Sequence, residues 1–530
     1  MSKSITLSNL SWSSPDGRQL FSNININFGP ERVGLIGRNG VGKTTLVRLI
    51  AGELSPSTGS VSVSGSLHVL RQSLAVSSDE NIADLFDARD ALSVLDRAQS
   101  GTATVEELAE ADWMLEPNIA EALAQVSLDI PLNTPLSTLS GGQRTRAALA
   151  AQIHAAPDFL VLDEPTNNLD REGRRAVIDL LAGWRGGAIV VSHDRELLET
   201  VDAIVELTSL GISRYGGNWS SYRERKSLEL AAAEHDLADA EKRSAEVDRK
   251  TQEAAERRAR RDGAGKKKAS QGSLPRIIAG GREMRAEQTS GAASLIANRL
   301  KGQAQEDLKT ARDRIEVLQP LTITLPPTGL PATKTVLRMQ SVTAGHSNDR
   351  PVLRNFSLEI TGPERIAIIG PNGSGKTTLL SVVTGALTTS SGAAHVGVRS
   401  AFLDQQVSLL DPARSIRDNF LRLNPQAGEN ACRAALARFM FRADAALQVV
   451  GTLSGGQMLR AGLACVLVGP QPPQLLILDE PTNHLDIDSI SAVEAGLRAY
   501  DGALLVVSHD EAFLTAIGIT RRVELGLSWR

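Results

Sequence analysis

Two short glycine-rich stretches of this chain have the composition of a phosphate-binding loop. GRNGVGKT begins at Gly37 and GPNGSGKT begins at Gly370, and both fit the pattern GxxxxGK[ST]. Each follows a short apolar run and precedes a helical stretch, so backbone N–H groups and a helix N-terminus should surround phosphate oxygens. The lysine should reach the β- and γ-phosphates, and the next threonine should bind Mg²⁺. The predicted nucleotide-binding residues are Gly37, Arg38, Asn39, Gly40, Val41, Gly42, Lys43, Thr44 and Thr45, and Gly370, Pro371, Asn372, Gly373, Ser374, Gly375, Lys376, Thr377 and Thr378.

Two adjacent carboxylates follow an apolar run in each half of the chain. FLVLDE ends in Asp163 and Glu164, and LLILDE ends in Asp479 and Glu480. Because burying an unpaired carboxylate is unfavourable, we expect a cation or a bound water beside them. The aspartates are predicted to bind Mg²⁺, and the glutamates are predicted to polarise the attacking water, a role worth ~10²–10⁴-fold in rate. Helix capping would explain one acid at a strand end, but it explains two adjacent acids in both halves less easily.

A histidine and a glutamine also recur at matching positions. His193 and His509 follow IVVS and LVVS. A structural role is the ordinary alternative for a single histidine, but the repetition favours contact with the γ-phosphate. Gln72 and Gln405 both lie 29 residues beyond the loop lysine. They are predicted to bind Mg²⁺ or the attacking water, and this shared register is their only support.

The pentapeptide LSGGQ occurs at 139–143 and again at 453–457. In both copies a serine should cap a helix, two glycines should expose backbone N–H groups, and an apolar helix should follow. Each copy is therefore a second predicted phosphate-binding helix start. The residues in question are Ser140, Gly141, Gly142 and Gln143, and Ser454, Gly455, Gly456 and Gln457.

These motifs must be positioned by two similar domains, because all of them occur twice and in the same order. Residues 29–61 reappear at 362–394 without a gap. Short apolar strands alternate with helical stretches in each half, which predicts an α/β fold with a largely parallel sheet. We expect domains at 1–218 and 331–530, joined by a linker at 219–330.

The bulk composition is typical of a globular protein with two or three domains. The chain has 530 residues, of which 42% are hydrophobic and 22% charged. Cys432 and Cys465 have neither a disulfide pattern nor a metal-binding spacing, which fits a reducing compartment. No apolar run reaches the ~18 residues that a membrane helix needs, and no signal peptide precedes the first domain. We expect a soluble, cytoplasmic protein.

Positive charge is concentrated in the linker. The whole chain carries −4, but the segment from Arg249 to Arg285 carries +8, which leaves −12 elsewhere. From about Ser221 to Arg261 the composition predicts a helix, which DGAGKKKASQGSLPR should end, and a second helical stretch should cover about 290–318. This predicts an antiparallel helical hairpin with its tip at 262–289 and a basic region around 249–289. A cationic tip favours an anionic target reached through phosphate contacts, and a flexible hinge is the alternative.

The paired loops, the LSGGQ segments and the DEPTNNLD and DEPTNHLD segments resemble ATP-binding cassette domains over nearly all of 1–215 and 335–530. The resemblance implies two P-loop ATPase domains in tandem, with ATP and Mg²⁺ as cofactors and hydrolysis at both sites. It also implies that each LSGGQ completes the nucleotide site of the other cassette, so that a monomer pairs its own two cassettes. One site would join Lys43, Thr44, Gln72, Asp163, Glu164 and His193 to Ser454, Gly455 and Gly456, and the other would join Lys376, Thr377, Gln405, Asp479, Glu480 and His509 to Ser140, Gly141 and Gly142.

Cassette domains usually carry an aromatic residue about 25 positions before the loop, where it stacks on adenine. Trp12 occupies that position in the first half, and Gly345 occupies it in the second. Because stacking contributes ~1 kcal/mol, the resemblance leaves the nucleotide preference of the second site open.

The arrangement of two cassettes joined by a long charged linker is similar to that of the ABC-F subfamily. NNLD and NHLD after DEPT are also the usual form in that subfamily, and YGGNWSSYRERKSLELAAAE at 215–234 resembles the start of its interdomain linker. This implies a ribosomal partner, with a linker that reaches tRNA and the peptidyl-transferase centre, and a role in translation or antibiotic resistance. About 19 extra residues between the glutamine and LSGGQ of the first cassette predict a short helical arm within 80–135. The alternatives are the energy-coupling subunit of a drug exporter and a DNA-maintenance ATPase. The RNA-contact candidates are Arg257, Arg258, Arg260, Arg261, Lys266, Lys267, Lys268 and Arg276.

Overall fold

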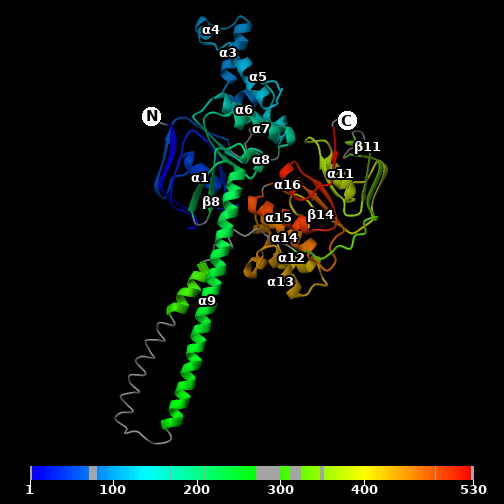
Figure 1. Cartoon of the computed structure of the whole chain (residues 1–530). Coiled ribbons are helices and arrows are strands. Elements are labelled where there is room, and N and C mark those ends of the chain that lie inside the picture. The colour runs from blue at the N-terminus through cyan, green and yellow to red at the C-terminus, as the bar shows by residue number, and fades with distance from the viewer. Residues whose placement is uncertain are drawn as a thin grey trace. The chain divides into compact units, whose positions relative to one another are not determined.

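The computed structural model (Figure 1) describes residues 3–70, 80–167, 169–208, 211–269, 299–310, 324–345, 351–483 and 485–526. Contacts divide the chain into two compact units. One unit consists of 1–220 and 321–530, and the other consists of 221–320. The first unit holds both cassettes, each of which has one largely parallel sheet and one smaller antiparallel sheet.

A six-stranded sheet forms the centre of the first cassette, in the order β5-β6-β7-β3-β8-β9. All neighbours pair in parallel except β8 and β9. β6 and β7 are buried at every position, as expected for apolar strands of a parallel sheet that is covered on both faces. The predicted parallel sheet is confirmed. The strands are β3 (Arg32–Ile36), β5 (Leu67–Leu70), β6 (Phe159–Asp163), β7 (Gly187–Val191), β8 (Ala203–Thr208) and β9 (Gly211–Gly216).

The first cassette is layered around this sheet. On one face, α1 lies under the antiparallel sheet β2-β1-β4, where Ile5, Leu46 and Val33 share one core cluster. On the other face, α6 and α7 supply Leu149 and Val177 to a second cluster. The remaining elements are β1 (Ser4–Ser13), β2 (Gln19–Phe28), β4 (Thr58–Ser64), α1 (Lys43–Ile50), α6 (Gly141–His154), α7 (Arg171–Gly183), α8 (Arg195–Leu198) and the 3₁₀ turn Leu136–Thr138.

Residues 80–135 form four helices, α2 (Ile82–Leu85), α3 (Arg89–Gln99), α4 (Val105–Glu110) and α5 (Leu115–Gln125). Equivalent β-bridges, Asn81–Pro135 and Ser415–Val449, enclose this region and its counterpart in the second cassette. The counterpart has only α12 and α13 before its 3₁₀ turns, so α3 and α4 are the added elements. They extend away from the sheets in Figure 1. Their role as an arm stays a prediction.

The second cassette repeats the layers of the first. Its parallel sheet has five strands in the order β14-β15-β16-β12-β17, and its antiparallel sheet has the order β11-β10-β13. Met339, Leu379 and Ile366 share the cluster between the two sheets. The strands are β10 (Thr335–Ala344), β11 (Leu353–Thr361), β12 (Arg365–Ile369), β13 (Ser391–Val396), β14 (Ser400–Leu403), β15 (Leu475–Asp479), β16 (Ala503–Val507) and β17 (Arg521–Glu524). The helices are α11 (Lys376–Val383), α12 (Ile416–Leu423), α13 (Glu429–Arg438), α14 (Gly455–Leu467), α15 (Ile487–Ala499) and α16 (Glu511–Ala516), with 3₁₀ turns at Ala443–Leu447 and Val450–Thr452.

A single helix, α9 (Trp219–Ala269), dominates the linker and has 51 residues. At 1.5 Å per residue its length is ~77 Å. The predicted break near Arg261 is wrong, because the helix continues through Gly263 and Gly265. Each glycine costs a helix ~1 kcal/mol relative to alanine, a cost that neighbouring alanine, arginine and lysine residues offset.

A second helical segment covers residues 299–310 of the linker. Its Lys301 Nζ lies 2.9 Å from Asp248 Oδ1 of α9, so the two segments run side by side at this point. Residues 270–298, which include most of the predicted tip, lie outside the described part of the chain. None of the helices in the described ranges combines the length and the apolar character that crossing a bilayer requires.

Candidate nucleotide sites

The two glycine-rich loops connect β3 to α1 and β12 to α11. Their last glycines, Gly42 and Gly375, have left-handed φ angles of 110° and 99°. A Cβ at Gly42 would lie 2.7 Å from the Phe21 ring, and a Cβ at Gly375 would lie 2.8 Å from Val352. Only glycine fits both the backbone and the contact, and its freedom lets the loop turn its N–H groups toward an anion.

The loop lysines fold back over their own loops. Lys43 Nζ donates to the Gly37 carbonyl at 2.6 Å, and Lys376 Nζ donates to the Gly370 carbonyl at 2.7 Å. Burial lowers the pKa of both ammonium groups. A desolvated ammonium at a loop mouth gains from a bound anion, because the anion supplies the charge partner that water no longer provides.

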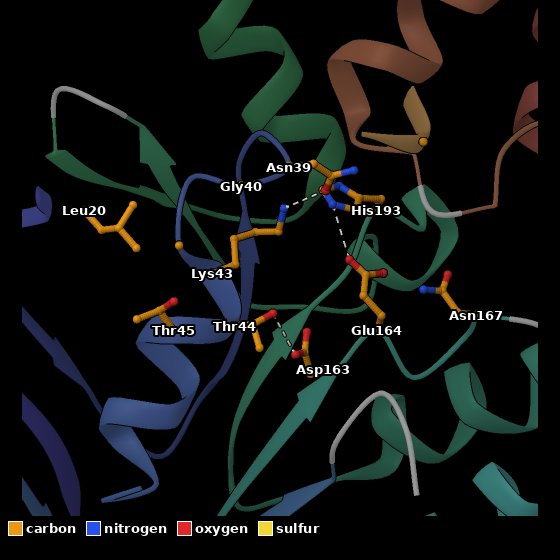
Figure 2. A pocket seen from close by; sticks show the side chains of 12 residues that line it. Leu20, Asn39, Gly40, Lys43, Thr44, Thr45, Asp163, Glu164, Asn167 and His193 are labelled. Carbon is orange, nitrogen blue, oxygen red and sulfur yellow. Dashed lines mark hydrogen bonds and ion pairs between the residues drawn. The ribbon is translucent and has the colours of Figure 1, made fainter. Parts of the chain in front are cut away.

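Thr44 and Asp163 meet at the start of α1 and the end of β6. Thr44 Oγ1 donates to Asp163 Oδ2 at 3.0 Å, as Figure 2 shows. Hydroxyl and carboxylate oxygens are donors that Mg²⁺ accepts, usually alongside phosphates and water. The described residues contain no cluster of three or more His, Cys, Asp or Glu side chains that would hold a metal alone. The pair therefore fits an ion that arrives with phosphates.

Glu164 and Glu480 each turn the chain at the end of a strand. Their φ angles are 52° and 46°, in the left-handed region that non-glycine residues seldom adopt. Burial, with a smaller contribution from the preceding aspartate, raises the pKa of Glu164 to about 8 and that of Glu480 to about 7. A carboxylate whose pKa lies near neutrality is suited to accept a proton from water.

The histidines stand next to these glutamates. His193 Nε2 lies 3.3 Å from Glu164 Oε1, and His509 Nε2 lies 3.4 Å from Glu480 Oε1. Burial and the nearby lysine lower the pKa of His193 to about 3 and that of His509 to about 4, so both rings are neutral at pH 7. The contact with Glu164 does not have hydrogen-bond geometry, so within the described ranges neither ring nitrogen of His193 has a hydrogen-bond partner. A buried polar group of this kind suits a ligand that supplies the missing partner.

The LSGGQ segments begin helices α6 and α14, as predicted. Ser140 Oγ accepts from Gln143 N at 3.2 Å, and Gln143 Oε1 accepts from Ser140 N at 3.0 Å. Ser454 and Gln457 form the same reciprocal capping box. The structure therefore engages both glutamine side chains in helix capping.

Gly455 reaches the nucleotide pocket of the other cassette. A cavity of about 420 Å³ lies in front of the first loop, within the range of small-molecule sites. Its lining includes Lys43, Asp163, Glu164 and His193 from the first cassette and Gly455 from the second. The structure thus brings together the groups that the sequence places more than 250 residues apart.

Two aspartates carry hydrogen bonds across the cassette interface. Asp486, the N-cap of α15, accepts from Asn39 N at 2.7 Å. Asp170, the N-cap of α7, accepts from Asn372 N at 3.4 Å. Each glycine-rich loop therefore touches the opposite cassette, a role for these two aspartates that their sequence motifs do not indicate.

The other predicted residues have separate outcomes. Trp12 pairs with Phe21 across β1 and β2 and does not line the pocket. Leu20 and Asn167 do line it, although neither was predicted as a site residue. The repeat was a signal for Asn167, because DEPTN recurs. Gln405 is exposed just after β14, and Gly345 follows β10. Of the RNA-contact candidates, Arg257 and Arg260 are exposed on α9. The same helix includes the backbone of Arg258, Arg261, Lys266, Lys267 and Lys268. Gln72 and Arg276 lie outside the described residues.

Comparison with known proteins supports the assignment of two cassette domains. The family model described as "ABC transporter" matches residues 21–167 and 353–483. The chain is 32% identical to the tylosin resistance ATP-binding protein TlrC of Streptomyces fradiae, over 93% of this chain and 92% of that protein. It is 29% identical to the energy-dependent translational throttle protein EttA of Mycobacterium tuberculosis, over 93% and 87%.

A solved structure shares the fold of the whole chain. The archaeal ribosome recycling factor aABCE1, in complex with the stalk protein aP1, matches with a TM-score of 0.59 and 18% identity, over 97% of this chain and 87% of that one. With two cassette domains matched and relatives that align over almost its full length, the chain belongs to the ABC-F subfamily of ATP-binding cassette proteins and is an ATP-hydrolysing enzyme.

Proposed function

We propose that this chain is an ATP-driven translation factor that binds the ribosome and uses cassette closure to insert its linker near tRNA and the peptidyl-transferase centre. The linker carries this proposal: α9 has 51 residues, and from Arg249 onward it belongs to the segment Arg249–Arg285, whose net charge is +8. A long cationic helix suits a deep polyanionic cleft, because every phosphate contact releases counterions. A relative named as a translational throttle protein supports the same target.

Closure in this proposal depends on nucleotide bound between the cassettes. Lys43 and Lys376 hold the β- and γ-phosphates, and the LSGGQ helix of the opposite cassette supplies backbone N–H groups. Thr44 with Asp163, and Thr377 with Asp479, would hold Mg²⁺, which would neutralise charge on the phosphates. Pairing of the cassettes is intramolecular, so the monomer is the acting form.

Hydrolysis then reopens the cassettes. Glu164 and Glu480 accept a proton from the attacking water, and His193 and His509 contact the γ-phosphate through their neutral rings. Burial of the glutamates supports the first role because it raises their pKa toward neutrality. Loss of the γ-phosphate removes one of the contacts that join the two cassettes, which weakens the closed state and lets the linker leave.

Antibiotic resistance by ribosome protection is the second candidate function. The observation that favours it is the relative named for tylosin resistance, of which the alignment covers 92%. Expression of the chain in a tylosin-susceptible bacterium should raise the inhibitory concentration of tylosin. The E164Q/E480Q variant should fail to do so, since it cannot cycle. An equal inhibitory concentration of tylosin with and without the wild-type chain would contradict this role.

A trapping experiment tests the ribosomal role. The E164Q/E480Q double variant should bind ATP without hydrolysing it and remain closed. Lysate from cells that express it is sedimented through sucrose with ATP, and the variant should pellet with ribosomes. The matched control is K43A/K376A, which should lose nucleotide and stay in the supernatant. Recovery of the trapped variant with membranes instead would favour the exporter alternative and contradict the proposal.

The phosphate contacts are tested by salt. Replacing Lys266, Lys267 and Lys268 with glutamine should weaken ribosome binding and flatten its salt dependence, because each phosphate contact contributes ~0.7–0.9 to the log–log slope. An unchanged slope would mean that this part of α9 does not touch RNA.

A further inference from the structure

Arg174 of α7 connects the loops that carry the two histidines. Its Nε and Nη2 donate to both carboxylate oxygens of Asp194, the latter at 2.6 Å. Its Nη1 donates to the backbone carbonyl of His509 at 3.0 Å. Asp194 directly follows His193 in the first cassette, whereas His509 belongs to the second. One guanidinium therefore bridges the two histidine loops across the cassette interface.

The bridge is buried and its geometry is fixed. The side chains of Arg174 and Asp194 are 11% and 5% exposed. Asp194 also caps α8, where its Oδ1 accepts from Glu196 N at 3.0 Å and from Leu197 N at 3.2 Å. A planar, two-pronged contact to a capped carboxylate allows little rotation. A displacement of the first histidine loop would therefore be passed to the carbonyl of His509.

Charge favours the same arrangement. Burial lowers the pKa of the Arg174 guanidinium, but Asp194 and Asp510 outweigh that effect and raise it. The arginine remains charged, and with burial and Lys376 it helps to lower the pKa of His509. Arg174 is thus electrostatically coupled to the second site as well as hydrogen-bonded to its histidine loop.

The second cassette does not repeat the Arg174 bridge at the matching positions. Instead, α15 reaches the first histidine loop through Glu494, whose Oε1 accepts from Arg195 Nη1 at 2.6 Å. The repeat places Ile490 in α15 where α7 has Arg174, and Asp510 where the first cassette has Asp194. Ile490 is a buried aliphatic residue in a core cluster of the second cassette, and its side chain has no group to donate. Asp510 caps α16 through Phe513 N. The two histidine loops are therefore held across the interface by different contacts, although the two nucleotide sites have matching motifs.

We propose that Arg174 is a positioning residue that makes the His509 loop of the second site depend on the state of the first site. The proposal rests on the assignment of His193 and His509 to the γ-phosphate. When a γ-phosphate fixes His193 in the first site, Asp194 is fixed with it, and Arg174 then holds the His509 carbonyl. His509 Nε2 lies 3.0 Å from Lys376 Nζ, so a correctly held loop presents this ring beside the phosphate-binding lysine.

Single-site enzymes make the dependence measurable. E164Q leaves only the second site to hydrolyse ATP, and E480Q leaves only the first. In the E164Q background, R174M should lower kcat about tenfold, as expected for loss of a charge-assisted hydrogen bond, with KM for ATP changed less than about twofold. In the E480Q background the same substitution should lower kcat by less than about threefold, because Asp194 keeps its backbone hydrogen bonds.

Two further variants separate positioning from stability. R174K retains a charge beside Asp194, so its melting temperature should stay close to that of the wild type. Its kcat at the second site should still be low, because one ammonium cannot replace the two-pronged bridge. R175M is the matched control: Arg175 neighbours Arg174 on α7, but its side chain is 78% exposed. It should leave both sites unchanged.

Equal loss of kcat in the two backgrounds, or full second-site activity in R174M or R174K, would overturn the proposal. A different failure identifies a wrong catalytic assignment: if E164Q and E480Q each retained wild-type turnover, the glutamates themselves would be dispensable.

Discussion

The two glutamates should give the two sites different pH dependences. Burial raises the pKa of both, to about 8 for Glu164 and to about 7 for Glu480. The surroundings of the two glutamates differ in two respects. Asp194 raises the pKa of Glu164 further, and the Arg174 charge opposes the rise in the pKa of Glu480. The acting form is the ionised carboxylate, so activity is present above the pKa and is lost as the pH falls through it.

The magnitude follows from these pKa values. At pH 7 a carboxyl with a pKa of about 8 is about one-tenth ionised, and one with a pKa of about 7 is about half ionised. Mg²⁺ and ATP bring the same charges to both sites, so the difference between the sites is the predicted quantity. The first site should lose activity at a pH about one unit higher than the second.

The assay uses the single-site enzymes. Turnover at saturating ATP is measured from about pH 6 to about pH 9, since the profile of kcat reports groups in the bound complex. The E480Q variant, which retains the first site, should have its acidic limb at the higher pH, and E164Q should have it at the lower. Coincident limbs, or limbs in the reverse order, would refute this account of the electrostatics.

Three further predictions concern the interface, the nucleotide pocket and a helix cap. E494Q removes the charge that pairs with Arg195 Nη1 at 2.6 Å across the cassettes, so KM for ATP should rise about tenfold at both sites. Kinetics of the single-site enzymes test this, and a rise in KM at one site alone would contradict it. Leu20→Ala should raise KM for ATP because Leu20 lines the pocket, whereas Trp12→Ala should change KM less than about twofold. If Trp12 stacked on adenine, nucleotide titrations would show the larger loss of affinity in Trp12→Ala. Ser140→Ala should lower the free energy of unfolding by about 1 kcal/mol through loss of the α6 cap, measured in urea, and an unchanged midpoint would argue against the cap.

Features set by local sequence could be predicted. The parallel strands, the loops of Lys43 and Lys376 and the helix starts at Ser140 and Ser454 depend on short patterns that occur twice. Apolar runs form buried strands, and serine before two glycines caps a helix in either context. The repeat made these predictions stronger, because two copies constrain one another.

Features set by tertiary contacts could not be predicted. The pocket lining includes Leu20 and not Trp12 because strand pairing turns Trp12 toward Phe21 and the edge of a core cluster. The bridge from Arg174 to His509 joins residues 335 positions apart, and no periodicity indicates it. The continuation of α9 past Gly263 was missed because glycine is a weak signal for a helix end when strong helix formers surround it.

The most direct test of the central claim is the affinity of the wild-type chain for purified ribosomes, measured at one salt concentration with a non-hydrolysable ATP analogue and again with ADP. Cassettes closed by nucleotide should present the linker to RNA, so binding should be tight with the analogue and weak with ADP. Equal affinity in the two states, or no binding in either, would contradict the account.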